Sequence, residues 1–527
     1  MNPGLKNIHR YIYFFGIALV AASLPLSKVT MSSGEIILFG NWIVEGHFKN
    51  KFRTFFNNKT ALVISSLFLL HIIGLIYTTD FNYGIFDLRV KVPMLLLPLI
   101  VSTTEPLRKK QFQNLLLLFV AAVLASTFFS MFNYLTKDFV DIREICAFIS
   151  HIRLSLMICL SIFILSYFLF SGDNYSKTLK LVFAIIIIWF AVFLVILESI
   201  TGLSILFTTA FILGLISLFK MKNKLYKMGI VALIIVISSL VVIYFNNIYK
   251  DYSSYSLVHK SEVRKVTAQG NPYSGDSLNY ETENGNYIFR NINDNELRES
   301  WNQRSAIKFD SNDRKGQFLK YTLYRFLTSK GFYKDADGVS KLSNDEIKAI
   351  ENGVASVNYL QKKSLRTRIY ETIWEIENAQ ESANPNGHSV MQRLEYWKAS
   401  LGIISDNLLF GVGTGDMNIA FAQQYDKMKS PLEKRWRLRS HNQFLSITVG
   451  FGLFGLLWFL IILVYPFLIK WVRKDYFYIV FFIILILSMT AEDTIESQAG
   501  LTFFVFFNTM LLLGRTIEET PDQQSVK

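Results

Sequence analysis

The sequence predicts an all-α polytopic membrane protein, with about twelve transmembrane helices and one large, mainly helical external loop domain between the ninth and tenth. The 527 residues are 51% hydrophobic and only 18% charged, which is too apolar for a water-soluble fold. The apolar residues also form long, nearly uncharged runs, as a helix surrounded by lipid requires. We place the spans at 11–27, 33–46, 60–77, 91–104, 112–134, 152–170, 178–197, 202–219, 228–246, 442–469, 476–490 and 499–514.

Positive charge is distributed unequally between the loops that connect these spans. With the N-terminus in the cytoplasm, five short cytoplasmic connections hold sixteen Lys and Arg residues, whereas the short external connections hold six. Lys and Arg in short loops resist translocation, so this bias fixes the orientation. The net charge of +13 could suggest a nucleic-acid partner, but this distribution of Lys and Arg argues against one. The hydrophilic insert is therefore predicted to face away from the cytoplasm.

The first apolar run resembles a signal peptide at first sight, because Lys6 and Arg10 precede it. Leu24-Pro25-Leu26-Ser27 lacks the small residues of a cleavage site, so we expect an uncleaved first helix. The spans then divide the chain into four predicted parts. These are an N-terminal bundle of about nine spans, an external loop domain, three C-terminal spans and a cytoplasmic tail, at 1–246, 247–441, 442–515 and 516–527.

The loop domain begins with an irregular stretch and continues with helices. Residues 251–295 are rich in Tyr, Ser, Asn and Gly and show no helical period. Ser343 and Glu346 have the spacing of a capping box, in which each side chain bonds to the other's free backbone donor. Helical patterns are predicted at 313–329, 343–356 and 358–379.

A further helix, 393–410, carries an apolar stripe long enough to lie on the outer leaflet of the membrane. Two interpretations apply to the glycine run that follows it, Gly411-Val-Gly413-Thr-Gly415. Its backbone donors could cradle a phosphate, although no Lys-Ser/Thr follows as in a P-loop. The alternative is a helix stop and tight turn. The stripe consists of Leu394, Trp397, Leu401, Ile404 and Leu408.

Residues with acid–base and phosphate-binding chemistry gather just before the tenth span. Arg435, Arg437 and Arg439 could match phosphate oxygens with their planar guanidinium groups, or anchor the chain to anionic lipid head groups. His441 could take a proton from a hydroxyl near neutral pH, or could be an ordinary interfacial side chain.

The context of His441 resembles a known family. His441-Asn442, nine residues, Gly452, two residues and Gly455 is similar to the histidine motif of the O-antigen ligase and O-antigen polymerase superfamily. It also lies where that family has it, at the end of the large external loop. Arg393, followed by Tyr396 and Trp397, resembles the family's approach to the motif, so the specific resemblance covers about residues 390–455.

The resemblance implies a multi-pass protein of the bacterial inner membrane whose loop domain and active site face the periplasm. It implies a metal-independent, inverting glycosyltransferase that uses no cofactor. The donor would be a glycan on undecaprenyl pyrophosphate, and the acceptor a sugar hydroxyl of the lipid A core or of another glycan. His441 would be the catalytic base or would orient that hydroxyl. The protein would contact membrane lipids, and it would have no nucleic-acid partner.

The resemblance also implies arginines that bind the pyrophosphate. Arg153, at the outer end of the sixth span, and Arg393 are similar in position to arginines of the family, although a snorkelling side chain is the competing account for each. Many members carry a Ser-Arg pair after the seventh span, where this chain reads Ser199-Ile-Thr201. Arg437 or Arg439 would then supply the missing charge.

Further residues are candidates for binding the acceptor or orienting the histidine: Asn442, Tyr396, Trp397, Glu492 and Asp493. The two carboxylates lie with Glu496 in a short external connection, where a solvated turn is the simpler explanation. The motif fits a ligase, which attaches the glycan to the core, and a polymerase, which extends one lipid-linked repeat with another. A lipid-linked sugar transporter is a third possibility, but the ionisable groups gather at the outer face instead of the bilayer centre.

Overall fold

The structure is a computed structural model that describes residues 3–137, 139, 141–171, 175–256, 264–275, 279–360, 364–378 and 385–517. It is mostly helical, as predicted. The strands among these residues are β1 (Thr282–Glu283) and β2 (Asn286–Tyr287), which pair antiparallel. Most of the predicted tail, from 518 on, and parts of the predicted irregular stretch, 257–263 and 276–278, lie outside the described residues.

A helix overlaps each of the twelve predicted spans, but fewer are long enough to cross a membrane. Six described segments have the length and apolar composition of a crossing: α7 (Lys109–Thr136), α8 (His151–Phe170), α9 (Lys177–Ile196), α10 (Ile200–Lys220), most of α11 (Lys224–Ser256) and residues 443–468. There are seven if α3 (Phe48–Asn57) and α4, which meet at 91°, form one bent span. The count of twelve is therefore not confirmed. The overlapping helices are α1 (Pro3–Ser23), α2 (Lys28–Glu45), α4 (Lys59–Gly74), α6 (Pro93–Thr103), α7 (Lys109–Thr136), α8 (His151–Phe170), α9 (Lys177–Ile196), α10 (Ile200–Lys220), α11 (Lys224–Ser256), α19 (Gln443–Val464), α20 (Tyr476–Ala491) and α21 (Gln498–Leu512).

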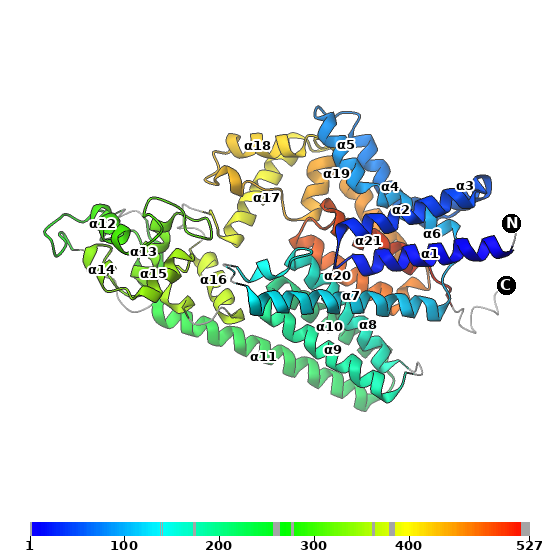
Figure 1. Cartoon of the computed structure of the whole chain (residues 1–527), viewed down its shortest axis with the longest axis horizontal. Helices are drawn as coiled ribbons and strands as arrows, with labels where there is room; N and C mark the ends of the chain where they lie inside the picture. The colour runs from blue at the N-terminus through cyan, green and yellow to red at the C-terminus, as the bar shows by residue number, and fades with distance from the viewer. Residues whose placement is uncertain are drawn as a thin grey trace.

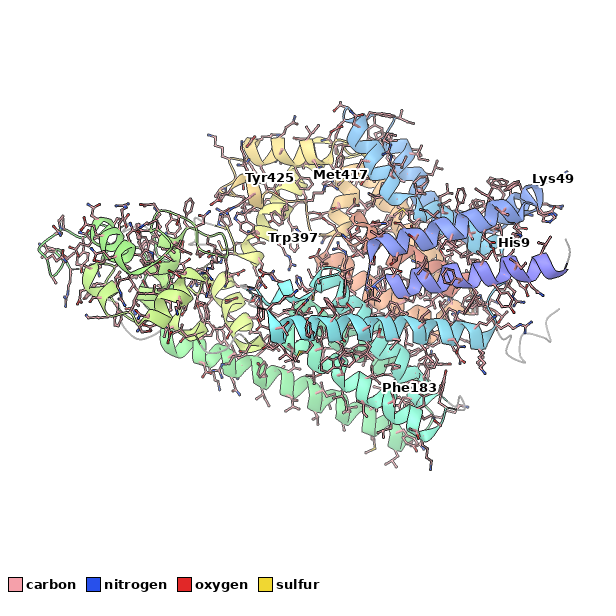
Figure 2. All side chains as sticks on the ribbon, viewed as in Figure 1. His9, Lys49, Phe183, Trp397, Met417 and Tyr425 are labelled. Atoms are coloured by element: carbon pink, nitrogen blue, oxygen red, sulfur yellow. The ribbon has the colours of Figure 1, made fainter. Side chains whose placement is uncertain are left out.

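These helices form a bundle with both chain termini at one end and the loop domain at the other (Figure 1). Lys49, in a predicted cytoplasmic connection, lies at the end that holds the termini (Figure 2). The long helix α11 continues past residue 246 and runs from the bundle to the loop domain (Figure 1). There the ring of its Tyr252 packs against Tyr370, with 4.9 Å between the centroids.

The loop domain has a hydrophobic core of its own, which includes Leu297, Trp301, Leu323 and Trp374. The predicted capping box is confirmed, because Ser343 and Glu346 exchange side-chain to backbone hydrogen bonds. The helices of this part of the chain are α12 (Asp294–Arg304), α13 (Leu319–Ser329), α14 (Ala336–Ser340), α15 (Asn344–Glu351) and α16 (Leu365–Glu377), with the 3₁₀ turn η2 (Val357–Tyr359).

Helix α13 begins later than the predicted residue 313 because a turn precedes it. The Asp313 carboxylate accepts the backbone amides of Lys315 (2.9 Å) and Gln317 (3.0 Å). Gly316 between them has a φ of 82°, which no residue of a right-handed helix adopts. A side chain that bonds to its own local backbone thus competes with the helix.

The predicted interfacial helix is α17 (Ser389–Asp406), and it packs on α18 (Met417–Lys427) through Tyr396, Ala399, Phe421 and Tyr425. Its predicted apolar stripe is divided. Trp397 and Ile404 pack against this small core. The exposed side chains of the stripe are Leu394, Leu401 and Leu408.

Helix α19 is broken at Gly452, which has φ 64° and ψ −164°. A Cβ atom there would lie 2.2 Å from the Leu409 carbonyl carbon, so only glycine fits. The break lets the backbone amide of Leu453 donate to the Leu408 carbonyl at 2.9 Å. The remaining short elements are α5 (Phe81–Lys91) and the 3₁₀ turns η1 (Ile142–Ile145), η3 (Lys434–Trp436), η4 (Tyr465–Leu468), η5 (Val472–Lys474) and η6 (Thr494–Glu496).

Candidate functional site around His441

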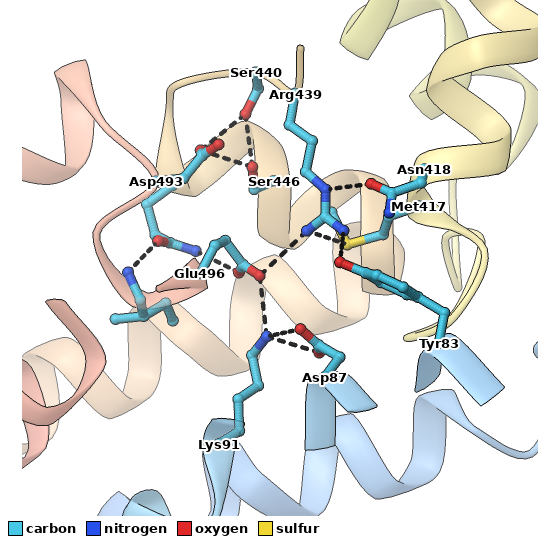
Figure 3. A network of polar contacts seen from close by, with 12 residues as sticks. Tyr83, Asp87, Lys91, Met417, Asn418, Arg439, Ser440, Ser446, Asp493 and Glu496 are labelled. Carbon is cyan, nitrogen blue, oxygen red and sulfur yellow. Dashed lines mark hydrogen bonds and ion pairs between the residues drawn. The ribbon is translucent and has the colours of Figure 1, made fainter. Parts of the chain in front are cut away.

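The backbone of His441 is held in a left-handed conformation, with φ 47°. Asp493, in the connection between α20 and α21, accounts for this. One of its carboxylate oxygens accepts the His441 amide at 3.2 Å. The other accepts the hydroxyls of Ser440 (3.1 Å) and Ser446 (2.8 Å), as Figure 3 shows. A conformation that is uncommon for a residue other than glycine is thus fixed from a separate element.

The imidazole of His441 is oriented by two neighbours. Its Nδ1 lies 3.4 Å from Glu492 Oε2, and its ring packs on Tyr396 with 5.5 Å between centroids. Among the described residues none is a hydrogen-bond partner of Nε2, and 32% of the side chain is exposed. Glu492 can therefore hold a proton on Nδ1 and leave Nε2 free to accept one from a substrate.

The charge of His441 depends on the same neighbours. Burial favours the neutral imidazole and would lower its pKa. The hydrogen bond to Glu492 and the charges of Glu492 and Asp493 outweigh burial, so the pKa of His441 is raised above its usual value. The imidazole is consequently a stronger base than a free histidine, and it is protonated over a wider pH range.

Three predicted residues of α17 lie at this site, because spacings of three and four place them on one side of the helix. Arg393 has its Nη2 3.9 Å from Glu492 Oε1. Tyr396 packs on the imidazole, and its buried hydroxyl has no partner among the described residues. Trp397 donates from Nε1 to the Ser440 carbonyl at 3.1 Å.

Asn442 has a structural position beside the histidine. Its side-chain oxygen accepts the backbone amides of Phe444 (3.0 Å) and Leu445 (3.2 Å), which makes it the N-cap of α19. Its amide nitrogen donates to the Thr490 carbonyl at 3.1 Å. The polar atoms of this motif residue are therefore already in use.

Arg153 lies in the first turn of α8, and its Nη1 donates to the Ser150 hydroxyl at 2.9 Å. Its Nε is buried without a hydrogen-bond partner among the described residues. The carboxylates whose charges act on it are Glu492 and Asp493, so it shares the carboxylates of His441. The predicted cation is thus close to the site and has an unused donor.

Arg437 and Arg439 have partners other than the two carboxylates beside the imidazole, Glu492 and Asp493. Arg437 forms an ion pair with Asp426 and donates to the Leu432 carbonyl at 2.9 Å. Arg439 donates to the Tyr83 hydroxyl at 2.6 Å, as Figure 3 shows. Both guanidinium groups are therefore already engaged by other side chains.

A buried ionic network lies beneath the site (Figure 3). Lys91 Nζ is 2.7 Å from Asp87 and 3.0 Å from Glu496, and Glu496 is 3.6 Å from Arg439. Glu496 also accepts from the Gln443 amide at 3.1 Å. Burial would raise the pKa of Glu496, but the two cations lower it. Asp87 and Lys91 were not predicted as site residues from the sequence, although their i, i+4 spacing could have indicated a pair.

The glycine run after α17 forms a turn whose backbone donors are all occupied. Gly411 donates to Asn407, and Val412 and Gly413 donate to Val449 and Gly450 at the break of α19. The next two amides, Thr414 and Gly415, donate to the Gly74 carbonyl and the Thr78 hydroxyl. This arrangement favours the helix-stop interpretation over a phosphate cradle.

Comparison with known proteins agrees with the motif. The family described as O-antigen ligase matches residues 353–460, which include α17, His441 and both motif glycines. No curated protein matches the chain. Residues 353–460 thus match the O-antigen ligase family, which confirms the resemblance of this part of the chain to the O-antigen ligase and polymerase superfamily.

Proposed function

We propose that this protein is a membrane glycosyltransferase that moves a glycan from undecaprenyl pyrophosphate to a sugar hydroxyl on the periplasmic face of the bacterial inner membrane. The observation that carries the proposal is the environment of His441. Its Nδ1 faces Glu492, its Nε2 has no hydrogen-bond partner among the described residues, and Arg393 lies on the far side of the same carboxylate. The O-antigen ligase domain supports the same class of reaction.

In this proposal His441 is the general base. Nε2 accepts the proton of the acceptor hydroxyl while its oxygen attacks the anomeric carbon of the donor sugar. The bond from that carbon to the pyrophosphate oxygen breaks on the opposite face, so the configuration inverts. The electron pair leaves with undecaprenyl pyrophosphate, and cations beside it stabilise the developing charge. No metal or cofactor is required.

We assign the pyrophosphate first to Arg153 and Arg393, because both share carboxylates with His441. Arg437 and Arg439 would have to leave Asp426 and Tyr83 before they could reach a phosphate. Tyr396 and Trp397 fix the histidine loop, and Asp493 fixes its backbone. The lipid A core is the proposed acceptor, which makes the protein a ligase; a polymerase would use the same chemistry.

The direct test is transfer of a lipid-linked glycan by purified protein. We expect His441→Ala to reduce kcat by about 10²- to 10⁴-fold, the usual contribution of a general base. His9→Ala is a matched control, since His9 bonds to Asn41 at the opposite end of the bundle (Figure 2). Wild-type transfer by His441→Ala would refute the mechanism. Transfer in detergent, where no transport can be observed, would exclude a transporter.

Ligase and polymerase are separated by the lipopolysaccharide of a strain that lacks the gene. A bare core together with accumulated lipid-linked polymer supports the ligase. A core that carries a single repeat indicates the polymerase.

A further inference from the structure

A cavity of about 300 Å³ lies between the outer ends of the bundle helices and the loop domain. On the bundle side it is lined by Arg143 of η1, by His151 at the start of α8 and by Ser199 between α9 and α10. On the other side it is lined by Lys315, by Arg368 of α16 and by Arg393 of α17. Its volume is at the lower end of the range of small-molecule sites, about 300–1,000 Å³.

The cavity adjoins the site of His441 through one residue. Arg393 lines the cavity, and its guanidinium is 3.9 Å from Glu492. Glu492 in turn lies 3.4 Å from the imidazole. His441 itself does not line the cavity. A ligand that fills the cavity would therefore lie beside the reacting atoms without replacing them.

Most charged groups in the cavity wall occur as pairs of opposite sign. Arg143 pairs with Asp141, Arg368 pairs with Glu371 at 2.9 Å, and His388 lies 3.8 Å from Glu375. Such pairs place fixed donors beside fixed acceptors. A sugar hydroxyl donates one hydrogen bond and accepts others, so a wall of this kind suits neighbouring hydroxyls better than it suits a bare anion.

Lys315 and Gln317 also line the cavity, and each side chain passes over a glycine that leaves room for it. The stem of Lys315 crosses Gly353, where a Cβ would lie 2.8 Å from it. The Gln317 amide crosses Gly387, where a Cβ would lie 2.0 Å from Nε2. Both glycines have positive φ, 74° and 81°. Lys315 has no carboxylate within ion-pair distance among the described residues, so its ammonium group remains available to a ligand.

The wall that carries these groups is rigid. Trp374 is buried, and the Arg325 guanidinium lies 3.5 Å from the centroid of its ring. The His388 ring packs on the same tryptophan at 5.3 Å. Arg325 is itself paired with the buried Glu283 at 2.9 Å. A wall fixed in this way can discriminate between ligands, because it does not rearrange to fit each of them.

We propose that the cavity is a saccharide subsite, which holds a sugar of the substrate through its hydroxyl groups while the reacting sugar lies at His441. This inference rests on the proposed function and adds the residues that select the glycan, chiefly Arg368 and Lys315. The sugar belongs either to the donor glycan or to the acceptor, and kinetics distinguish the two.

The test is steady-state kinetics of the purified full-length protein, with donor and acceptor varied in turn. We expect Arg368→Gln and Lys315→Gln to raise one KM by about 5- to 10-fold with little change in kcat, as the loss of a polar contact to substrate implies. Arg366→Gln is the matched control, because Arg366 is on the same helix but pairs with Asp251 outside the cavity. Lys315→Gln breaks no ion pair among the described residues and keeps most of the stem that lies over Gly353, so a raised KM reports a lost contact to substrate.

The outcomes are distinct. A raised KM for the donor alone assigns the sugar to the donor glycan, and a raised KM for the acceptor alone assigns it to the acceptor. If both KM values stay within twofold of wild type, or if only kcat falls, the subsite is refuted while the proposed function stands. If wild-type protein transfers no glycan, the proposed function fails and the subsite fails with it.

Discussion

The carboxylate of Glu492 couples the two groups that the proposed reaction requires, a base and a cation. One oxygen faces the His441 imidazole and the other faces Arg393. Because one side chain meets both, a change in its charge alters the basicity of the imidazole and the position of the guanidinium together.

This coupling predicts a shift in pH dependence for Glu492→Gln. His441 must be neutral to act as a base, so transfer falls as the pH decreases through its pKa. Glu492 raises that pKa, and the neutral amide of Gln does not. We therefore expect the acidic limb of the kcat/KM profile to move to lower pH, with a lower plateau. Glu433→Gln, which removes a carboxylate paired with Arg435, should leave the limb in place. An unchanged limb in Glu492→Gln would contradict the assigned role.

The sequence allowed part of this site to be predicted. Arg393, Tyr396 and Trp397 were singled out by the resemblance to the family, and helical spacing then places them on one side of α17. Glu492 and Asp493 were predicted from the topology, which puts their connection on the same side as His441. The pairing of Arg437 with Asp426 was not predicted. A guanidinium group binds a carboxylate as well as a phosphate, and the sequence alone does not show which of the two lies beside it.

At the scale of elements, the break in α19 explains the first glycine of the motif, Gly452. Gly452 adopts backbone angles that are essentially restricted to glycine, and the carbonyl of Leu409 lies where its Cβ would be. The motif therefore includes a structural residue, Gly452, which lets α19 pack on the segment after α17, as well as the candidate base His441.

We expect Gly452→Ala to destabilise the protein by roughly 3 kcal/mol, from backbone strain of about 1–3 kcal/mol plus the clash. Thermal unfolding in detergent measures this, and transfer activity should fall in parallel. Gly450→Ala is the control, because its nearest neighbour to an added Cβ is Met417 Sδ at 3.5 Å, an ordinary contact. Equal unfolding temperatures for both variants would show that the break is not required.

Hydropathy located the elements better than it located their ends. Each predicted span contains a helix, because an apolar run in lipid has few alternatives to a helix. The bend between α3 and α4, the turn before α13 and the length of α11 depend on particular side-chain and tertiary contacts. A hydropathy window does not register such contacts.

At the scale of the whole molecule, the network around Lys91 joins parts of the chain that are far apart in sequence. Its members come from α5, from η6 and from the segment before α19 (Figure 3). Sequence separation of about 400 residues explains why a reading of local patterns missed it.

Substitution of Lys91 should show how much this network contributes to the free energy of unfolding. Lys91→Met leaves Asp87 and Glu496 buried without their shared cation, and we expect a loss of about 3–5 kcal/mol. Lys427→Met breaks an exposed pair with Asp406 and should cost less than about 1 kcal/mol. Chemical unfolding of the two variants provides the comparison. Similar losses would mean that the network contributes little.

Helix α11 sets the distance between the helical bundle and the loop domain. Its 33 residues span about 50 Å at roughly 1.5 Å per residue, whereas the hydrocarbon layer is about 30 Å thick. The excess reaches the loop domain, where Asp251 pairs with Arg366 and Tyr252 packs on Tyr370. A continuous helix is stiff, so the loop domain is held at a constant distance from the helical bundle. In the proposed reaction, a glycan that enters between the loop domain and the bundle is therefore limited in thickness by this helix, whatever its sugar sequence.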